Sequence, residues 1–122
     1  MKGQEGAYFT PPPLVNLVVR LLDPEPKESV IDPACGAGRF VAAALDHVFA
    51  KIDTNPKLPM ARKADVKRQW ASDRLFAVDK DAVSLRLCKA YLSLLGDGRS
   101  HIYRANTIDR SDCRIRRRLA NA

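Results

Sequence analysis

Residues 32–40, Asp-Pro-Ala-Cys-Gly-Ala-Gly-Arg-Phe, are the part of this chain whose types and spacing could do chemistry. They follow a short apolar run and precede a helical pattern, so we expect them where a strand turns into a helix. A Gly-x-Gly turn there lets the backbone approach a ligand closely and directs the first helical N–H groups towards it. The carboxylate of Asp32 can accept a hydrogen bond from a cationic group. The run predicts a ligand-binding turn, and a simple helix-capping turn is the alternative.

The same residues disfavour two other kinds of ligand-binding turn. Dinucleotide-binding folds use a longer glycine series, and a phosphate-cradling loop ends in Gly-Lys followed by Ser or Thr. This turn has a single Gly-x-Gly, followed by Arg39 and Phe40. A nicotinamide-dependent enzyme is therefore disfavoured.

The elements that must position the turn follow from the apolar periodicity. We expect helices over about 12–22, 39–51 and 81–95, and strands over 29–32, 74–79 and 101–104. Thr10 is expected to cap the first helix, which begins in a run of three prolines. Alternating helices and strands imply parallel pairing, and therefore an α/β, doubly wound sheet.

Residues 52–73 interrupt this alternation, and 60–71 could form a short exposed helix. Residues 51–74 carry seven basic side chains against three acidic ones, and the tail 110–118 has five arginines. The net charge of +7 favours a polyanionic partner. These stretches would suit a DNA phosphate backbone, and a solvated helix face is the alternative.

Composition limits the class of protein. A chain of 122 residues is expected to form one domain. No apolar run approaches the roughly 20 residues of a membrane span, and the N-terminus lacks the apolar core of a signal peptide. Cys35, Cys88 and Cys113 have no metal-ligand spacing, so we expect reduced thiols in a cytoplasmic protein. His47 and His101 are expected to be structural.

Two motifs in the expected order resemble those of a known family. Residues 32–40 resemble motif I of the S-adenosylmethionine-dependent DNA methyltransferases, in the form of the adenine-N6 enzymes, and residues 6–11 look like their motif X. Residues 105–108 are similar to motif III. The resemblance covers about residues 3–50 and 74–109 and is closest to the modification subunits of type I restriction–modification systems and related restriction–methylation enzymes.

This resemblance implies a Rossmann-like class I methyltransferase fold, apparently truncated to strands 1–3 with flanking helices, and S-adenosylmethionine as cofactor. Asp32 would meet the ammonium group, Thr10 would hold the carboxylate, and Asp79 would accept hydrogen bonds from the ribose hydroxyls. Lys80 would point towards the adenine edge and Asn106 would meet the adenine amino group, although a turn asparagine is the alternative. The implied cofactor-binding residues are Tyr8, Phe9, Thr10, Asp32, Pro33, Ala34, Cys35, Gly36, Gly38, Phe40, Asp79, Lys80 and Asn106.

One family motif is missing from the sequence. The Asn/Asp-Pro-Pro-aromatic motif that holds the target amine is absent, because Asn55-Pro56-Lys57-Leu58 lacks the second proline and the aromatic residue. We therefore expect the cofactor-binding part of a DNA adenine-N6 methyltransferase that is inactive alone. A vestigial fold acting as a DNA-binding or assembly module, or part of an RNA or protein methyltransferase, are the alternatives.

The expected layout is a single partial methyltransferase domain over 1–122. Its parts are the motif X segment and helix (1–28), the motif I strand, turn and helix (29–51), the basic insertion (52–73), the motif II and III region (74–109) and the basic tail (110–122). Half a sheet would leave an apolar edge beside strand 1. We therefore expect a homo-oligomer or a partner, such as the remaining methyltransferase half or a specificity subunit, besides DNA.

Overall fold

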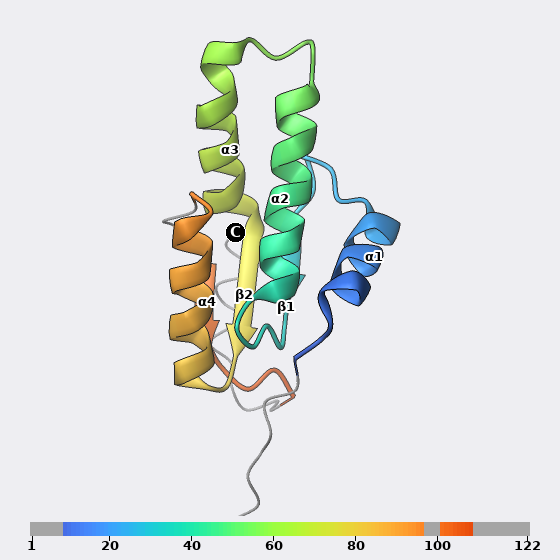
Figure 1. Ribbon diagram of the computed structural model, residues 1–122. Coiled ribbons are helices and arrows are strands. Elements are labelled where there is room, and N and C mark those ends of the chain that lie inside the picture. The colour runs from blue at the N-terminus through green and yellow to red at the C-terminus, as the bar shows by residue number, and fades with distance from the viewer. Residues whose placement is uncertain (1–8, 97–100, 109–122) are drawn as a thin grey trace, which may run out of the picture.

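Three parallel strands and four helices form the described part of the chain, residues 9–96 and 101–108 of a computed structural model (Figure 1). In chain order they are α1 (Pro12–Leu22), β1 (Val30–Asp32), α2 (Arg39–Thr54), α3 (Met60–Arg74), β2 (Leu75–Asp79), α4 (Ala82–Leu94) and β3 (His101–Arg104). The six helices and strands that the sequence predicted outside 52–73 are all present, with ends that differ by at most three residues from those expected.

The sheet has the order β1-β2-β3, and both pairs are parallel. Val30 lies opposite Leu75, and Phe76 lies opposite His101. Because all three strands run the same way, Asp32, Asp79 and Arg104 end at the same edge of the sheet, which we call the carboxyl edge. Strands β2 and β3 therefore lie on the same side of β1, the strand that carries the glycine turn.

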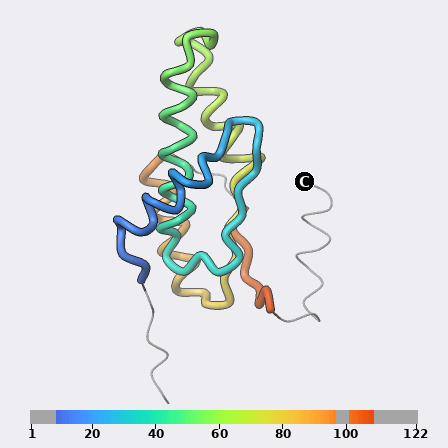
Figure 2. The backbone as a smooth tube through the Cα atoms, turned by 90° about the vertical axis from the view of Figure 1, so that its right-hand side faces the viewer, coloured from blue at the N-terminus to red at the C-terminus, as the bar shows by residue number. Residues whose placement is uncertain are grey.

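Helices α2 and α4 cover one face of the sheet, as the side view in Figure 2 shows. Val30, Leu75, Ala77 and Ile102 point into this layer and pack with Leu45, Val48, Leu85, Cys88 and Leu92 of the two helices. The alternate strand residues lie on the other face, where the rings of Phe76 and His101 stack at 4.8 Å between centroids. The hydrophobic core therefore lies between the sheet and α2 and α4.

The basic insertion proves to be part of a helical hairpin. Helix α2 continues to Thr54 and ends before Pro56, because the residue that precedes a proline is disfavoured in a helix. Helix α3 is longer and less exposed than predicted, since Trp70 and Ala71 are buried and the Trp70 Nε1–H donates to Glu28 O at 3.1 Å. In Figure 1 the hairpin extends beyond the end of the sheet that is opposite the carboxyl edge.

Helix α1 packs on the outside of α2 (Figure 2). The prediction that Thr10 caps this helix is wrong. Pro11 is the N-cap residue, its carbonyl accepts the N–H groups of Leu14 and Val15, and no side chain caps the helix. A proline at the first helical position has no N–H to satisfy, so the cap is dispensable.

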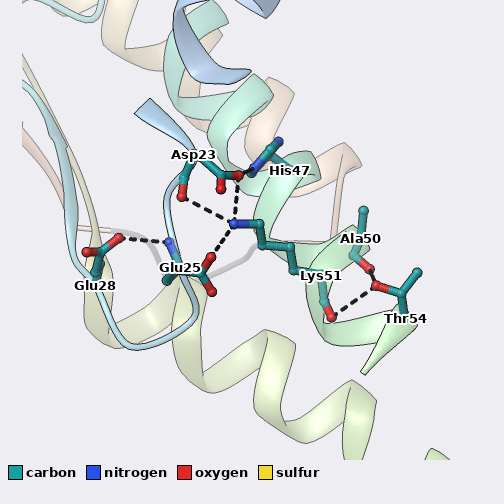
Figure 3. Close-up of polar contacts among 7 residues, drawn as sticks. All are labelled: Asp23, Glu25, Glu28, His47, Ala50, Lys51 and Thr54. Carbon is teal, nitrogen blue, oxygen red and sulfur yellow. Dashed lines mark hydrogen bonds and ion pairs between the residues drawn. The ribbon is translucent and has the colours of Figure 1, made fainter. Parts of the chain in front are cut away.

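A polar cluster ties the end of α1 to α2 (Figure 3). Asp23 lies just after α1 with a left-handed backbone, φ +46°. Its carboxylate contacts His47 Nε2 at 2.8 Å and Lys51 Nζ at 2.7 Å, and Lys51 also pairs with Glu25. His47 therefore has a structural role, as expected, although no pattern in the sequence indicates its partner.

The described residues include no helix that has the length and apolar character needed to cross a lipid bilayer.

Candidate functional site

The glycine turn after β1 is fixed by hydrogen bonds to β2. The Cys35 N–H donates to Val78 O at 2.9 Å, and the Gly36 N–H donates to Asp79 Oδ2 at 2.8 Å. Within the turn, the Ala34 N–H donates to Asp32 Oδ1 at 3.1 Å, and the Gly38 N–H donates to Cys35 O at 2.8 Å. The conformation of the turn is therefore fixed by hydrogen bonds within the chain itself.

Asp79 is the centre of this arrangement. Besides the bond from Gly36, its other carboxylate oxygen accepts the Asp81 N–H at 2.8 Å, and its carbonyl accepts the Ala105 N–H at 3.0 Å. Asp81 in turn caps α4 by accepting the Ser84 N–H at 2.7 Å. One residue thus connects the glycine turn, the start of α4 and the segment after β3.

The two glycines of the turn have left-handed backbones but different surroundings. At Gly36, with φ +51°, an added Cβ would meet no atom of the described residues within 4 Å, so the backbone faces open space in this part of the chain. At Gly38, with φ +89°, an added Cβ would lie 2.5 Å from Cys88 Sγ. Gly36 therefore leaves room for a ligand, whereas Gly38 allows α4 to pack against the turn.

The segment that follows β3 also contacts the glycine turn. The Thr107 hydroxyl donates to Pro33 O at 3.0 Å, which links this segment to the glycine turn. Asn106 is exposed, and its side-chain oxygen accepts the Ile108 N–H at 3.3 Å. That local bond is the turn role named above as the alternative for Asn106. The Thr107 contact spans 74 positions of sequence and has no local signal.

Burial and neighbouring charge shape the electrostatics of the site. Partial burial raises the pKa of Asp32, the nearby Asp79 carboxylate raises it further, and the Ala34 N–H opposes both. A cationic ligand group beside these two carboxylates would relieve their repulsion. The pKa of Cys35 is also raised, first by its hydrogen bond with Cys88 and then by burial. Cys35 and Cys88 are thiols that form no disulfide, as expected, and Cys113 lies outside the described residues.

The other predicted site residues are more scattered. Phe9 is exposed, with the Arg39 guanidinium 5.5 Å from its ring centroid, and Thr10 is half-buried. Phe40 lines a hollow of about 580 Å³ between α1, α2 and β1, which also includes Asp32 and Pro33. Ala34 and Lys80 are exposed. Tyr8 lies outside the described residues.

The basic side chains of the hairpin are partly paired. Lys67 pairs with Asp53 at 3.0 Å, Lys63 donates to Asp53 O, and Arg68 pairs with Asp65. Because the hairpin also lies at the end of the sheet away from the carboxyl edge, these contacts favour the solvated-face interpretation for it. The basic tail lies outside the described residues.

Comparisons with known proteins show which proteins this chain is similar to. The chain is 46% identical over 46 residues to the methylase subunit of the type I restriction enzyme EcoEI of Escherichia coli, covering 38% of this chain and 9% of that protein. It is 27% identical over 103 residues to the type II restriction enzyme and methyltransferase RM.BcgI of Heyndrickxia coagulans, covering 84% of this chain and 15% of that protein. The chain therefore spans only 9% and 15% of the length of these two curated relatives.

A solved structure of a related protein has a similar fold. The M protein of the type I restriction enzyme EcoKI of Escherichia coli superimposes with a TM-score of 0.70 and 27% identity, over 88% of this chain and 22% of that one. The family described as N-6 DNA methylase matches residues 1–119, nearly the whole sequence. The chain belongs to the N-6 DNA methylase family.

Proposed function

We propose that this chain is the S-adenosylmethionine-binding part of an adenine-N6 DNA methyltransferase of a restriction–modification system. The observation that carries the proposal is the glycine turn held against two carboxylates, Asp32 and Asp79, at the carboxyl edge of a parallel sheet. Ligands of open α/β sheets bind outside this edge. The family is described as a DNA methylase, and one relative is named as a restriction enzyme and methyltransferase. We therefore include DNA in the proposal, as the substrate of the whole protein.

The residues of the edge suit the proposed cofactor in charge and in shape. The cofactor carries an ammonium group and a sulfonium centre, and the edge offers the carboxylates of Asp32 and Asp79. Open space above Gly36 gives a ligand access to the backbone of the turn. We infer that Asp32, Gly36 and Asp79 form the core of the binding site, with Phe9 and Thr10 at its margin.

The bound cofactor would supply an electrophilic methyl group. The residues of this chain would bind and orient it. Asp32 would accept hydrogen bonds from the ammonium group. Asp79 can accept ribose hydroxyls only with the lone pairs that its bonds to Gly36 and Asp81 leave free, since each oxygen accepts one backbone N–H. The proposed role of Asp79 is therefore double, in binding and in holding the turn. The residues that hold the target amine lie outside this chain's motifs.

The proposal is tested by calorimetric titration of the purified chain with S-adenosylhomocysteine, with NADH as the control ligand. We expect saturable binding of S-adenosylhomocysteine alone, because the turn is already held in one conformation. Binding that appears only when the downstream part of a methyltransferase is supplied in trans would mean that this chain carries an incomplete half-site. Failure of both titrations would contradict the proposal and favour a vestigial module.

A further inference from the structure

Residues 105–108, which we call the β3 strap, cross the carboxyl edge of the sheet. Strand β2 lies between β3 and β1, so these two strands are about 10 Å apart. The Thr107 hydroxyl, three residues after the end of β3, nevertheless donates to Pro33 O at 3.0 Å, directly after the end of β1. Three residues reach at most about 10–11 Å. The strap must therefore run directly past the end of β2, and Figure 1 shows this segment in orange-red across the lower end of the sheet.

The strap is held at two points, and both acceptors are backbone carbonyls. The Ala105 N–H donates to Asp79 O at 3.0 Å, and Ala105 is buried. The Thr107 hydroxyl donates to the carbonyl of Pro33, the residue after Asp32. Within the described residues, none of the hydrogen bonds of the strap uses the carboxylate of Asp32 or Asp79. The strap therefore borders the proposed cofactor site and leaves its two carboxylates to the ligand.

These contacts form a closed frame around the site. The glycine turn is bonded to Asp79 through the Gly36 N–H, Asp79 is bonded to the strap through Ala105, and the strap returns to the turn through Thr107. The last link is made by an exposed hydroxyl group. A substitution can therefore remove that link without altering either carboxylate or the buried core.

We infer that Thr107 is a positioning residue of the cofactor site, whose bond to Pro33 O holds the β3 strap as a wall beside the adenine of the ligand. The inference rests on the proposed function. There Asp32, at the end of β1, accepts the ammonium group and Asp79, at the end of β2, accepts the ribose, so the adenine lies further along the edge, towards β3. The strap begins at that point and contains Asn106, which the sequence predicts to meet the adenine amino group.

Thr107 acts through the strap and does not itself touch the ligand. Without the bond to Pro33, the strap spends part of the time away from the position that completes the site. The apparent Kd of a ligand then rises by the inverse of the fraction of molecules in which the strap is in place.

The first test is calorimetric titration of the whole chain with S-adenosylhomocysteine. Thr107→Val keeps the shape of the side chain and removes the hydroxyl, so it should weaken binding at least about fivefold. Thr107→Ser keeps the hydroxyl and should stay within about twofold of the natural chain. Thr54→Val is the matched control, because it removes an equally exposed hydroxyl bond, to Ala50 O at 2.9 Å, at the far end of α2. Its affinity should not change.

Ligands that lack one end of the cofactor separate positioning from a general loss of structure. Thr107→Val should weaken 5′-methylthioadenosine, which keeps the adenine, by the same factor as S-adenosylhomocysteine. It should leave the affinity for S-ribosylhomocysteine, which has no adenine, unchanged. Asp32→Ala should give the reverse pattern between these two partial ligands. Competition against S-adenosylhomocysteine measures both, and thermal scans would verify that the variants remain folded at the temperature of the titration.

The outcomes distinguish this inference from the proposed function. If the natural chain binds S-adenosylhomocysteine and Thr107→Val binds it equally well, the inference is wrong and the proposed function stands. Tighter binding by Thr107→Val would also overturn it, because the strap would then obstruct the site. An equal loss for S-ribosylhomocysteine would give Thr107 a general structural role. Failure of the natural chain to bind S-adenosylhomocysteine, with and without the downstream part of a methyltransferase, would contradict both.

Discussion

The two glycines of the turn predict different consequences for the same substitution. Gly38→Ala should destabilise the chain by about 2–4 kcal/mol, because it adds a left-handed strain and a clash with Cys88. Gly36→Ala should cost only about 1–2 kcal/mol, since its Cβ meets open space. Gly36→Ala should nevertheless weaken binding of S-adenosylhomocysteine about tenfold, because the methyl group occupies the space of the ligand. Urea denaturation and calorimetry measure the two effects separately.

A double-mutant cycle separates the clash from the backbone strain. In a Cys88→Ala background the closest contact of the methyl group added at position 38 disappears, so Gly38→Ala should cost less than in the natural sequence. An equal cost in both backgrounds would mean that backbone conformation alone explains the glycine. Equal ligand affinity in Gly36→Ala and the natural chain would place the ligand elsewhere.

Asp79 should affect both stability and binding. Asp79→Ala removes the acceptor for the N–H groups of Gly36 and Asp81, which should cost about 1–3 kcal/mol of unfolding free energy. If Asp79 also accepts the ribose hydroxyls, S-adenosylhomocysteine binding should weaken by a further 1.5–3 kcal/mol, roughly 10- to 150-fold. Asp81→Ala is the control, because it removes only the cap of α4. Loss of stability with unchanged affinity would give Asp79 a structural role alone.

The sequence could identify the residues of the turn because their signals are local. The Gly-x-Gly spacing, the acid at the end of β1 and the cap at Asp81 can each be recognised within a few positions. The bonds from Gly36 to Asp79 and from Thr107 to Pro33 join residues 43 and 74 positions apart. No local pattern encodes such contacts, because they depend on the parallel pairing of the three strands.

At the scale of elements, the polar cluster at Asp23 should anchor α1 to α2. Hydrogen bonds from Lys51 and then His47 lower the pKa of Asp23 below its ordinary value of 3.8. An acid with a lowered pKa stabilises the fold above its unfolded-state pKa and loses that effect as the pH falls through the folded-state value. Asp23→Gly should therefore lower the Tm at pH 7, and the difference from the natural chain should shrink as the pH falls through the folded-state pKa of Asp23, which lies below 3.8. Thermal scans across this pH range measure it.

A second substitution isolates the backbone of the same residue. Asp23→Ala loses the carboxylate and also places alanine in a left-handed conformation, φ +46°. It should lower the Tm about 3–8 °C more than Asp23→Gly does. Asp65→Ala, which breaks the exposed pair with Arg68, should leave the Tm almost unchanged. If Asp23→Gly behaves like Asp65→Ala, the cluster does not anchor α1.

The α2–α3 hairpin is the part of the fold that the apolar periodicity of the sequence predicted least well. Helix α3 is polar along most of its length, so its apolar pattern predicted only a short exposed segment. It is fixed instead by the buried side chain of Trp70, which donates a hydrogen bond to Glu28 O, and by the ion pair of Lys67 with Asp53 of α2. A helix whose contacts are mostly polar carries little of the periodic signal by which helices are predicted.

At the scale of the whole molecule, the sheet is unfinished on the side of β1. Among the described residues, β1 pairs with β2 only, and its Ile31 side chain is 47% exposed. Val19, Leu22, Ile31 and Phe40 line the hollow of about 580 Å³ beside this strand. An apolar edge strand with free backbone groups can pair with another chain.

The side of β1 that faces away from β2 predicts that the isolated chain self-associates. The substitution Ile31→Lys should reduce this association. A lysine on an edge strand opposes pairing with a second copy, because it adds charge to the new interface. Sedimentation velocity over a hundredfold range of concentration should show association in the natural chain and much less in the variant. Met60→Lys adds the same charge at the hairpin and should have no effect. A natural chain that stays monomeric throughout would mean that the edge is closed by other means, and association that survives Ile31→Lys would place the contact elsewhere.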